Sequence, residues 1–354
     1  MRSSRFYLLL IVTALALLGA VAVTLEQRSP SSLQVLGTAA FPLLAEDPSA
    51  AARVTVVTSE GSYALERSAA PGLWLLPEAG GYPVERQAIT GLLVRLARLQ
   101  LFEAKTALPD RLELLGLAGP EAGPDQGRRL VILDSDGGTL VDAVIGPNRD
   151  NLDGLGGGGT YLRYADSDQA WLALGEVSVP AEGPDFLDRV LVNLPGSIVA
   201  QMTVEPPDGD VSLTARRSER GALGLSLDPA PPAGMVVEDF LLRQMAGSFE
   251  RLTFRAVRPA EDLALPEPWR VTVTTFDGIQ VTLTLQQIEG AVWGRLEATA
   301  VAPPLEPGGP PREDAAAFAA DLAARSDGWV YQLEPLLLQR LAQRRQDLVS
   351  AVGE

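Results

Sequence analysis

The hydrophobic and polar positions divide the chain into an apolar leader and a long alternating body. Residues Phe6–Leu25 hold no charged side chain. As a helix, this segment would be about 30 Å long, which matches the hydrocarbon core of a bilayer. Arg2 and Arg5 precede it, so the positive-inside tendency predicts a cytoplasmic N-terminus. We therefore expect a single-pass inner-membrane protein whose C-terminal body lies in the periplasm.

A cleaved signal peptide is the alternative interpretation of the same segment. Ala20-Val21-Ala22 fits the small-residue pattern that precedes a cleavage site. A secretory signal core is usually about 7–15 residues long, whereas this apolar run is longer and continues beyond Ala22. The length favours a retained anchor, and the sequence leaves cleavage open.

After the leader, strand-like alternation and helix-like periodicity recur in the same order twice. Alternating apolar and polar positions predict β-hairpins over residues 53–67, 129–146, 160–174 and 269–285. Apolar positions at helical spacing predict helices over residues 85–102, 186–191, 236–245 and 336–348. Because the strands come as hairpins and not as βαβ units, mainly antiparallel sheets covered by helices are expected.

The predicted fold is therefore α+β, with two similar halves of mainly antiparallel sheet that follow one N-terminal transmembrane helix. The domain prediction is a membrane anchor at 1–28, a linker at 29–51, a first α+β repeat at 52–197 and a second at 198–354. The boundary between the repeats follows Leu194-Pro195-Gly196, where proline and glycine end an element.

Composition removes most classes of chemistry. The chain has 29 basic and 45 acidic residues, a formal net charge of −16 that disfavours nucleic acid as a ligand. It has no cysteine and no histidine, which excludes disulfides, histidine-based acid–base relays and nearly all zinc or haem sites. Carboxylate chemistry and an oxygen-only calcium site remain.

Two loops match binding motifs only in part. Gly154–Gly159 fits the G-x-G-x-x-G spacing of a dinucleotide site, but the residues that follow predict a strand where such a site needs a helix. Asn148–Gly154 is rich in oxygen ligands, but Leu152 interrupts the calcium-loop pattern. Both segments are interpreted as loops, and no metal or cofactor residue is assigned.

Acidic and aromatic side chains supply the other candidates. The acidic ones are Asp134, Asp136, Asp142, Glu182 and Asp185. Turn formation and the preference of acids for helix N-termini explain most of these positions, so no catalytic residue is assigned. The tryptophans 74, 171, 269, 293 and 329 all fall in or beside predicted strands, where sheet packing explains them and sugar stacking is the alternative.

An ordered set of short motifs resembles the domain-of-unknown-function family 4340. The motifs are Gly72-Leu73-Trp74, Tyr82-Pro83-Val84-Glu85, Gly146, Thr160-Tyr161-Leu162-Arg163, Trp171-Leu172 and Phe186-Leu187-Asp188. The resemblance implies a membrane-anchored envelope protein that occurs with ABC transporter components of the gliding-motility type. It carries over no catalytic residue.

Two functions follow from these observations. The first is a non-enzymatic periplasmic accessory protein of an ABC transporter, held beside a permease or auxiliary subunit by its N-terminal helix. The alternative is a glycan-processing enzyme of the cell envelope that depends on a pair of carboxylates. The absence of a recognisable site in the sequence favours the first.

Overall fold

The computed structural model describes residues 37–152, 157–209, 213–302 and 313–351, which form two compact units. Of the described residues, the first unit comprises those up to Leu75 together with those between Val84 and Phe186, and the second comprises Leu76–Pro83 and those from Leu187 onward. Within the described ranges, no helix is long and apolar enough to cross a membrane. The predicted anchor, Phe6–Leu25, lies outside those ranges.

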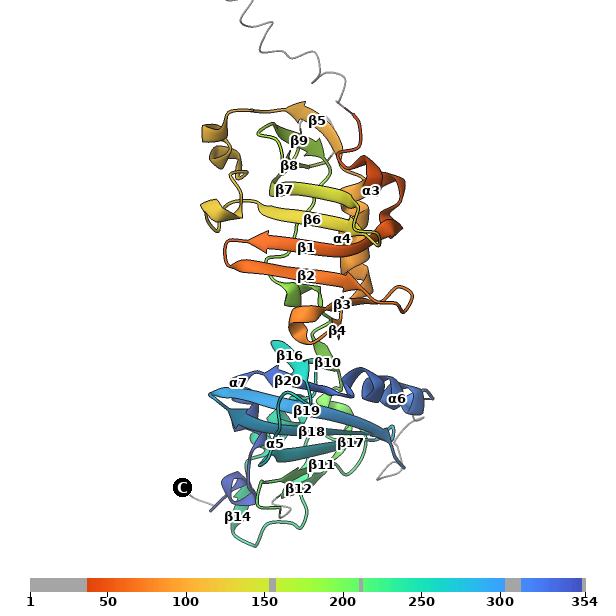
Figure 1. The fold of residues 1–354 in the computed structure, drawn as a ribbon. Helices are drawn as coiled ribbons and strands as arrows, with labels where there is room; N and C mark the ends of the chain where they lie inside the picture. The colour runs from red at the N-terminus through yellow and green to blue at the C-terminus, as the bar shows by residue number, and fades with distance from the viewer. Residues whose placement is uncertain (1–36, 153–156, 210–212, 303–312, 352–354) are drawn as a thin grey trace, which may run out of the picture. The chain divides into compact units, whose positions relative to one another are not determined.

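The first unit is built on a large antiparallel sheet (Figure 1). Its strand order is β4-β3-β2-β1-β6-β7-β8-β9-β5. The strands are β1 (Ala51–Thr58), β2 (Gly61–Arg67), β3 (Trp74–Leu76), β4 (Tyr82–Pro83), β5 (Gln100–Ala104), β6 (Arg128–Asp134), β7 (Thr139–Arg149), β8 (Gly159–Tyr164) and β9 (Ala170–Leu174). By its contacts, β4 belongs to the second unit.

Two α-helices and several short 3₁₀ helices accompany this sheet. The α-helices are α3 (Pro42–Glu46) and α4 (Arg86–Ala97). One face of α4 is buried through Ile89, Leu92, Leu93 and Leu96, the i, i+3, i+4, i+7 spacing of an amphipathic helix. The 3₁₀ helices are η1 (Pro48–Ala50), η2 (Pro77–Ala79), η3 (Pro109–Arg111), η4 (Glu113–Leu115), η5 (Pro120–Ala122) and η6 (Gly183–Phe186).

The second unit contains a sheet of order β13-β12-β11-β17-β18-β19-β20-β16 and the small pairs β10-β15 and β14-β21. Its strands are β10 (Val190–Val192), β11 (Val199–Glu205), β12 (Leu213–Arg216), β13 (Ser226–Leu227), β14 (Met235–Val237), β15 (Leu252–Thr253), β16 (Ala256–Pro259), β17 (Trp269–Thr275), β18 (Ile279–Ile288), β19 (Ala291–Ala300), β20 (Trp329–Leu333) and β21 (Val349–Ala351). Its helices are η7 (Gly196–Ile198), α5 (Asp239–Gly247), α6 (Ala315–Ser326), α7 (Pro335–Leu341) and η8 (Arg345–Leu348).

The two large sheets follow the same chain path. A meander of four strands (β1–β4) begins the first sheet, and one of three strands (β11–β13) begins the second. An α-helix and an edge strand come later in the chain, and a four-strand meander then fills the space between the first strand and that edge strand. In each sheet, segments that are distant in the chain pair to join the two meanders. These pairs are β1 with β6 in the first sheet and β11 with β17 in the second. The predicted α+β class of mainly antiparallel sheets with helices is confirmed, as are the four hairpins read from alternation.

The helices predicted by apolar spacing needed correction at their ends. The helix expected over 85–102 ends at Ala97. Leu99, which lies between the helix and β5, and Leu101, which lies in β5, are buried although neither is helical. The helix expected over 236–245 begins at Asp239, since the β-branched Val236 and Val237 pair with β21. The final helix ends at Leu341, and a separate turn, capped by Arg344 and Asp347, follows it.

The helix predicted over 186–191 was wrong. The Asp188 carboxylate accepts a hydrogen bond from the Val190 backbone N–H at 3.0 Å, which closes a turn, and Val190 and Val192 then pair with β15. Helix α6 was not predicted by the apolar pattern. Its buried residues include Ala319 and Leu322, so alanine supplies much of its inner face and the contrast between faces is weak.

Candidate docking surface

The acidic residues of the β6–β7 hairpin serve the hairpin itself. The Asp134 carboxylate accepts hydrogen bonds from the backbone N–H groups of Asp136 and Gly138 at 2.9 and 2.7 Å, the usual role of aspartate in a tight turn. Asp142 accepts two bonds of 2.9 Å from Arg129, and this pairing raises the pKa of the Arg129 guanidinium. The two carboxylates are therefore engaged by different local partners.

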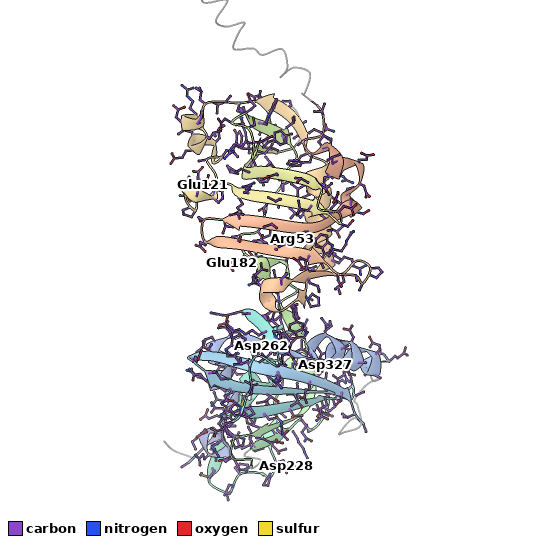
Figure 2. The ribbon with its side chains drawn as sticks, in the orientation of Figure 1. Arg53, Glu121, Glu182, Asp228, Asp262 and Asp327 are labelled. Carbon is purple, nitrogen blue, oxygen red and sulfur yellow. The ribbon has the colours of Figure 1, made fainter. Side chains whose placement is uncertain are left out.

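The other acidic candidates lie apart from that hairpin. Glu182 is exposed on the loop before η6, and Asp185 is exposed within η6 (Figure 2 labels Glu182). Across the described ranges, no three acidic, histidine or cysteine side chains gather closely enough to hold a metal ion.

The oxygen-rich segment that was interpreted as a loop begins within β7, where Asn148 pairs with Thr160 of β8 and contributes to packing. Its side-chain oxygen accepts a hydrogen bond from the Thr160 hydroxyl at 2.8 Å and another from the Val177 backbone N–H at 3.3 Å. Thr160 is fully buried, so this bond satisfies a polar group that water cannot reach. Residues 153–156, which include part of the glycine-rich loop, lie outside the described ranges, and the strand predicted after that loop is β8.

The five tryptophans belong to strands, as the sequence predicts. Trp74, Trp171 and Trp293 are buried, and each lies in a strand of its unit's sheet. Arginine side chains cover three of the rings, with Arg67 over Trp74, Arg258 over Trp293 and Arg344 over Trp269 at 5.0–5.6 Å from the ring centroids. These contacts are those of cation–π packing on a sheet surface.

The connection between β5 and β6 is fixed by motif residues on β7 and β8. Arg163 donates hydrogen bonds to the backbone oxygens of Leu117 and Ala118 at 2.6 and 3.2 Å. Gly146 lies so close to the same connection that a Cβ atom there would approach Leu117 Cδ2 to 2.8 Å. A larger residue at 146 would therefore displace this connection.

Tyr82 lies at the centre of an aromatic cluster in the second unit. Its ring centroid is 4.9 Å from that of Trp329, 5.7 Å from that of Phe254 and 6.2 Å from that of Tyr331. Burial raises the pKa of both Tyr82 and Tyr331. At Gly80, a Cβ atom would overlap the Pro259 ring. The motif containing Tyr82 thus supplies packing for the second unit.

Large apolar side chains are exposed on both units. In the first unit these are Leu43 (57% exposed), Phe102 (37%), Leu108 (50%) and Leu114 (83%). In the second they are Leu223 (90%), Met235 (39%), Val236 (45%), Phe240 (58%) and Leu336 (63%). Sequence reasoning missed these residues because their type predicts a core position. Exposed apolar side chains that gather in one region are the usual mark of an interaction surface.

Shallow hollows accompany some of these residues. One hollow of about 320 Å³ lies beside Leu43, between the start of α3, the start of β7 and Tyr164. Another, of about 230 Å³, is lined by Leu336, Arg251 and Arg340 between α7 and β15. Both hollows mix apolar and charged walls, as the rims of protein interfaces do.

The fold and these surfaces define an α+β protein of two sheet-based units with exposed apolar side chains on each. The chain belongs to the family described as Domain of unknown function (DUF4340), whose model matches residues 74–268. The match spans the second half of the first unit and much of the second. No curated protein and no solved structure matches the chain.

Proposed function

We propose that this chain is a membrane-anchored, non-enzymatic accessory protein of an ABC transporter, with its body in the periplasm. The length and lack of charge of Phe6–Leu25 support the anchor. The resemblance noted above supports the association with a permease or auxiliary subunit. An anchor confines the body to the membrane plane and raises its effective concentration near a partner, so even a weak contact suffices there.

One observation carries the non-enzymatic part of this proposal. The motif residues that link the chain to its family each make a packing or backbone contact. Thr160 and Arg163 hold loops by hydrogen bonds, Tyr82 fills an aromatic cluster, and Phe186 is buried against Tyr63. Residues that define an architecture are expected in a protein whose task is to present surfaces to a partner.

We also propose that the two units arose by duplication. Apart from the additional strand β4 in the first, their sheets have the same strand order, and an α-helix precedes the edge strand in both. A duplicated body offers two related surfaces that can diverge separately. Superposition of an experimental structure of one unit on the other would test this proposal, and a different handedness of the meanders would contradict it.

Extraction and purification of the native protein test the proposed function. The full chain should stay with the membrane pellet in alkaline carbonate and co-purify with a transporter permease after mild solubilisation. The purified protein should not hydrolyse envelope glycans. Release by carbonate, or glycan hydrolysis abolished by a single Asp or Glu substitution, would contradict the proposal and favour the exported or enzymatic alternative.

A further inference from the structure

Three of the exposed apolar side chains of the first unit lie on its edge strand and on the connection that follows it. Phe102 is on β5, and Leu108 and Leu114 are on the connection from β5 to β6. Figure 1 shows β5 at one end of the first unit, with this connection beside it. We call these three residues the β5 face. Leu43, also exposed, follows the short segment that pairs with β5 through Ala39 and Gln100.

Phe102 points to the outer side of β5, next to a β-bulge. Side chains alternate along a strand, so the buried Leu101 (2% exposed) places Phe102 (37% exposed) on the opposite side. Along the β5–β9 pair, Leu101 lies opposite Ala173 and Glu103 lies opposite Leu172, so Phe102 has no partner of its own in the ladder. Because of this extra residue, Glu103 is exposed as well, beside the aromatic ring.

The two leucines project from a connection that is held in place. Leu112 and Leu117, which lie on either side of Leu114, are buried and pack with Val144 and Ala170. The hydrogen bonds from Arg163 to Leu117 and Ala118 fix the same stretch. The exposed side chain of Leu114 is therefore presented by an ordered support, which lowers the entropic cost of binding a partner there.

The β5 face is also the part of the body that is tied most directly to the proposed anchor. The Gly37 N–H donates to the Leu101 backbone oxygen at 2.6 Å, and Leu101 N–H donates to Thr38 at 2.9 Å. The stretch from Leu25 to Gly37 can reach about 40 Å at most, at roughly 3.3–3.6 Å per residue. If Phe6–Leu25 is retained in the bilayer, β5 lies within that distance of the membrane surface.

We infer that the β5 face binds the periplasmic surface of an integral membrane protein, at an apolar hollow with a neutral or basic rim; this inference rests on the proposed function. The tether keeps the face near such surfaces, and Phe102, Leu108 and Leu114 supply apolar anchors. From Phe102 to Leu114 the chain has three acidic and two basic residues. Attraction to anionic lipid depends on clustered basic residues, so this balance favours a protein over the bilayer itself.

Photo-crosslinking of the full chain in native membranes tests this inference. A photoreactive amino acid replaces Phe102, Leu108 or Leu114 in turn, and Leu223 and Phe240 of the second unit serve as controls, being 90% and 58% exposed. The β5-face positions should crosslink to one integral membrane protein, and the control positions should not. Leu114→Asp, with the photoreactive group at 108, should lower the yield at least about tenfold, whereas Leu223→Asp should leave it unchanged.

The outcomes separate this inference from the proposed function. Adducts with phospholipid alone at 102, 108 and 114 would overturn it in favour of a lipid surface. Crosslinks confined to positions 223 or 240, with a permease still co-purifying, would contradict the inference that the β5 face is the binding surface. They would leave the proposed function intact. Release of the chain by carbonate, with no transporter subunit recovered, would remove the proposed function itself. Unchanged thermal unfolding of the Leu114→Asp variant would show that the loss of crosslinking is not a loss of folding.

Discussion

The two units share a strand order but differ in the connection that leaves their edge strands. In the first unit, residues 105–127 join β5 to β6, contain three 3₁₀ helices and expose Leu108 and Leu114. In the second, residues 260–268 join β16 to β17 and keep Leu263 and Leu265 partly buried. A shared path of strands therefore has a longer connection in one unit only, and that connection contributes Leu108 and Leu114 to the β5 face.

A second difference lies in how the last two strands of each meander are joined. In the first unit, residues 165–169 make a short turn between β8 and β9. In the second, the chain between β19 and β20 includes α6, which packs on β19 and β18 and buries Ala319 and Leu322. Helix α6 thus adds buried core to the second unit, whereas the longer connection after β5 adds the exposed Leu108 and Leu114 to the first. The predictions below test how far this division of roles extends.

The largest effect is expected from the aromatic cluster of the second unit. Strand β20 buries Tyr331 against the rings of Tyr82 and Phe254, whereas β9 of the first unit buries Trp171 beside Ala170, Leu172 and Ala173. Tyr331→Ala should lower the free energy of unfolding of the second unit by about 3–5 kcal/mol, the usual cost of removing a fully buried aromatic side chain. Hydrogen exchange of the full chain in detergent should locate the loss in β16 and β20.

Tyr331→Phe is the matched control for this substitution. It removes the hydroxyl, whose hydrogen bond to the Arg325 backbone oxygen is long at 3.4 Å, and keeps the ring against Phe254. Its cost should stay near or below about 1 kcal/mol. Equal loss of protection in β6 and β7 would contradict the view that the aromatic cluster serves the second unit alone.

A smaller effect is expected from two arginines that tie the second strand of each sheet to the loop before the first. Arg217 is 4% exposed and donates to the backbone oxygens of Val199, Gly196 and Ala222. Arg67 is exposed and donates a hydrogen bond to the backbone oxygen of Ser49. Arg217→Met should cost about 2–3 kcal/mol, because it leaves several poorly hydrated carbonyl groups without donors, while Arg67→Met should cost less than about 1 kcal/mol.

Urea unfolding of the two methionine variants measures this contrast directly. Methionine keeps the apolar stem of arginine, so the variants differ mainly in the hydrogen bonds that they lose. Equal losses of stability would mean that the buried Arg217 contributes no more than the exposed Arg67. That result would contradict the predicted difference between the two arginines.

The sequence predicts the hairpins of both units because each depends on neighbouring residues. The alternation around Asp136-Gly137 and Asp277-Gly278 fixes a turn and two strands at once, and the structure has both hairpins. The pairing of β1 with β6 and of β5 with β9 joins distant segments, and no local pattern encodes it. The same limit explains why the helix over 85–102 was predicted too long, since Leu99 and Leu101 are apolar in either state.

The candidate docking surface could not be predicted from the sequence, for a related reason. Leu114 and Leu112 are the same residue type two positions apart, yet one is 83% exposed and the other 4%. Their difference is set by packing against Val144 and Ala170, which lie far away in the chain. The bulge beside Phe102 likewise depends on the register of β5 against β9. The motifs around Tyr82 and Arg163 could be found from the sequence, but their contacts could not.

The smallest expected effect concerns the 3₁₀ turns that lead into the first strand of each sheet. Asp47 caps η1, and its carboxylate accepts hydrogen bonds from the backbone N–H and the hydroxyl of Ser49 at 2.9 and 2.5 Å. The equivalent turn η7 follows Pro195 and has no side-chain cap. The hydrogen bond from the Ser49 hydroxyl is the main cause that lowers the pKa of Asp47 below its ordinary value of 3.8.

A lowered carboxyl pKa means that the folded state favours the ionised form. The cap should therefore stabilise the first unit above the unfolded-state pKa, near 3.8, and this contribution should vanish as the pH falls through the lower folded-state pKa. We expect Ser49→Ala to move the Asp47 carboxyl titration, followed by its ¹³C chemical shift, upward toward the ordinary value. Because Asp47 is exposed, the effect on overall stability should be small, and Asp47→Asn should remove its pH dependence. If Ser49→Ala left the Asp47 titration unchanged, the hydrogen bond from Ser49 would not stabilise the ionised carboxylate. The Asp47 cap would then not be an energetic difference between η1 and η7.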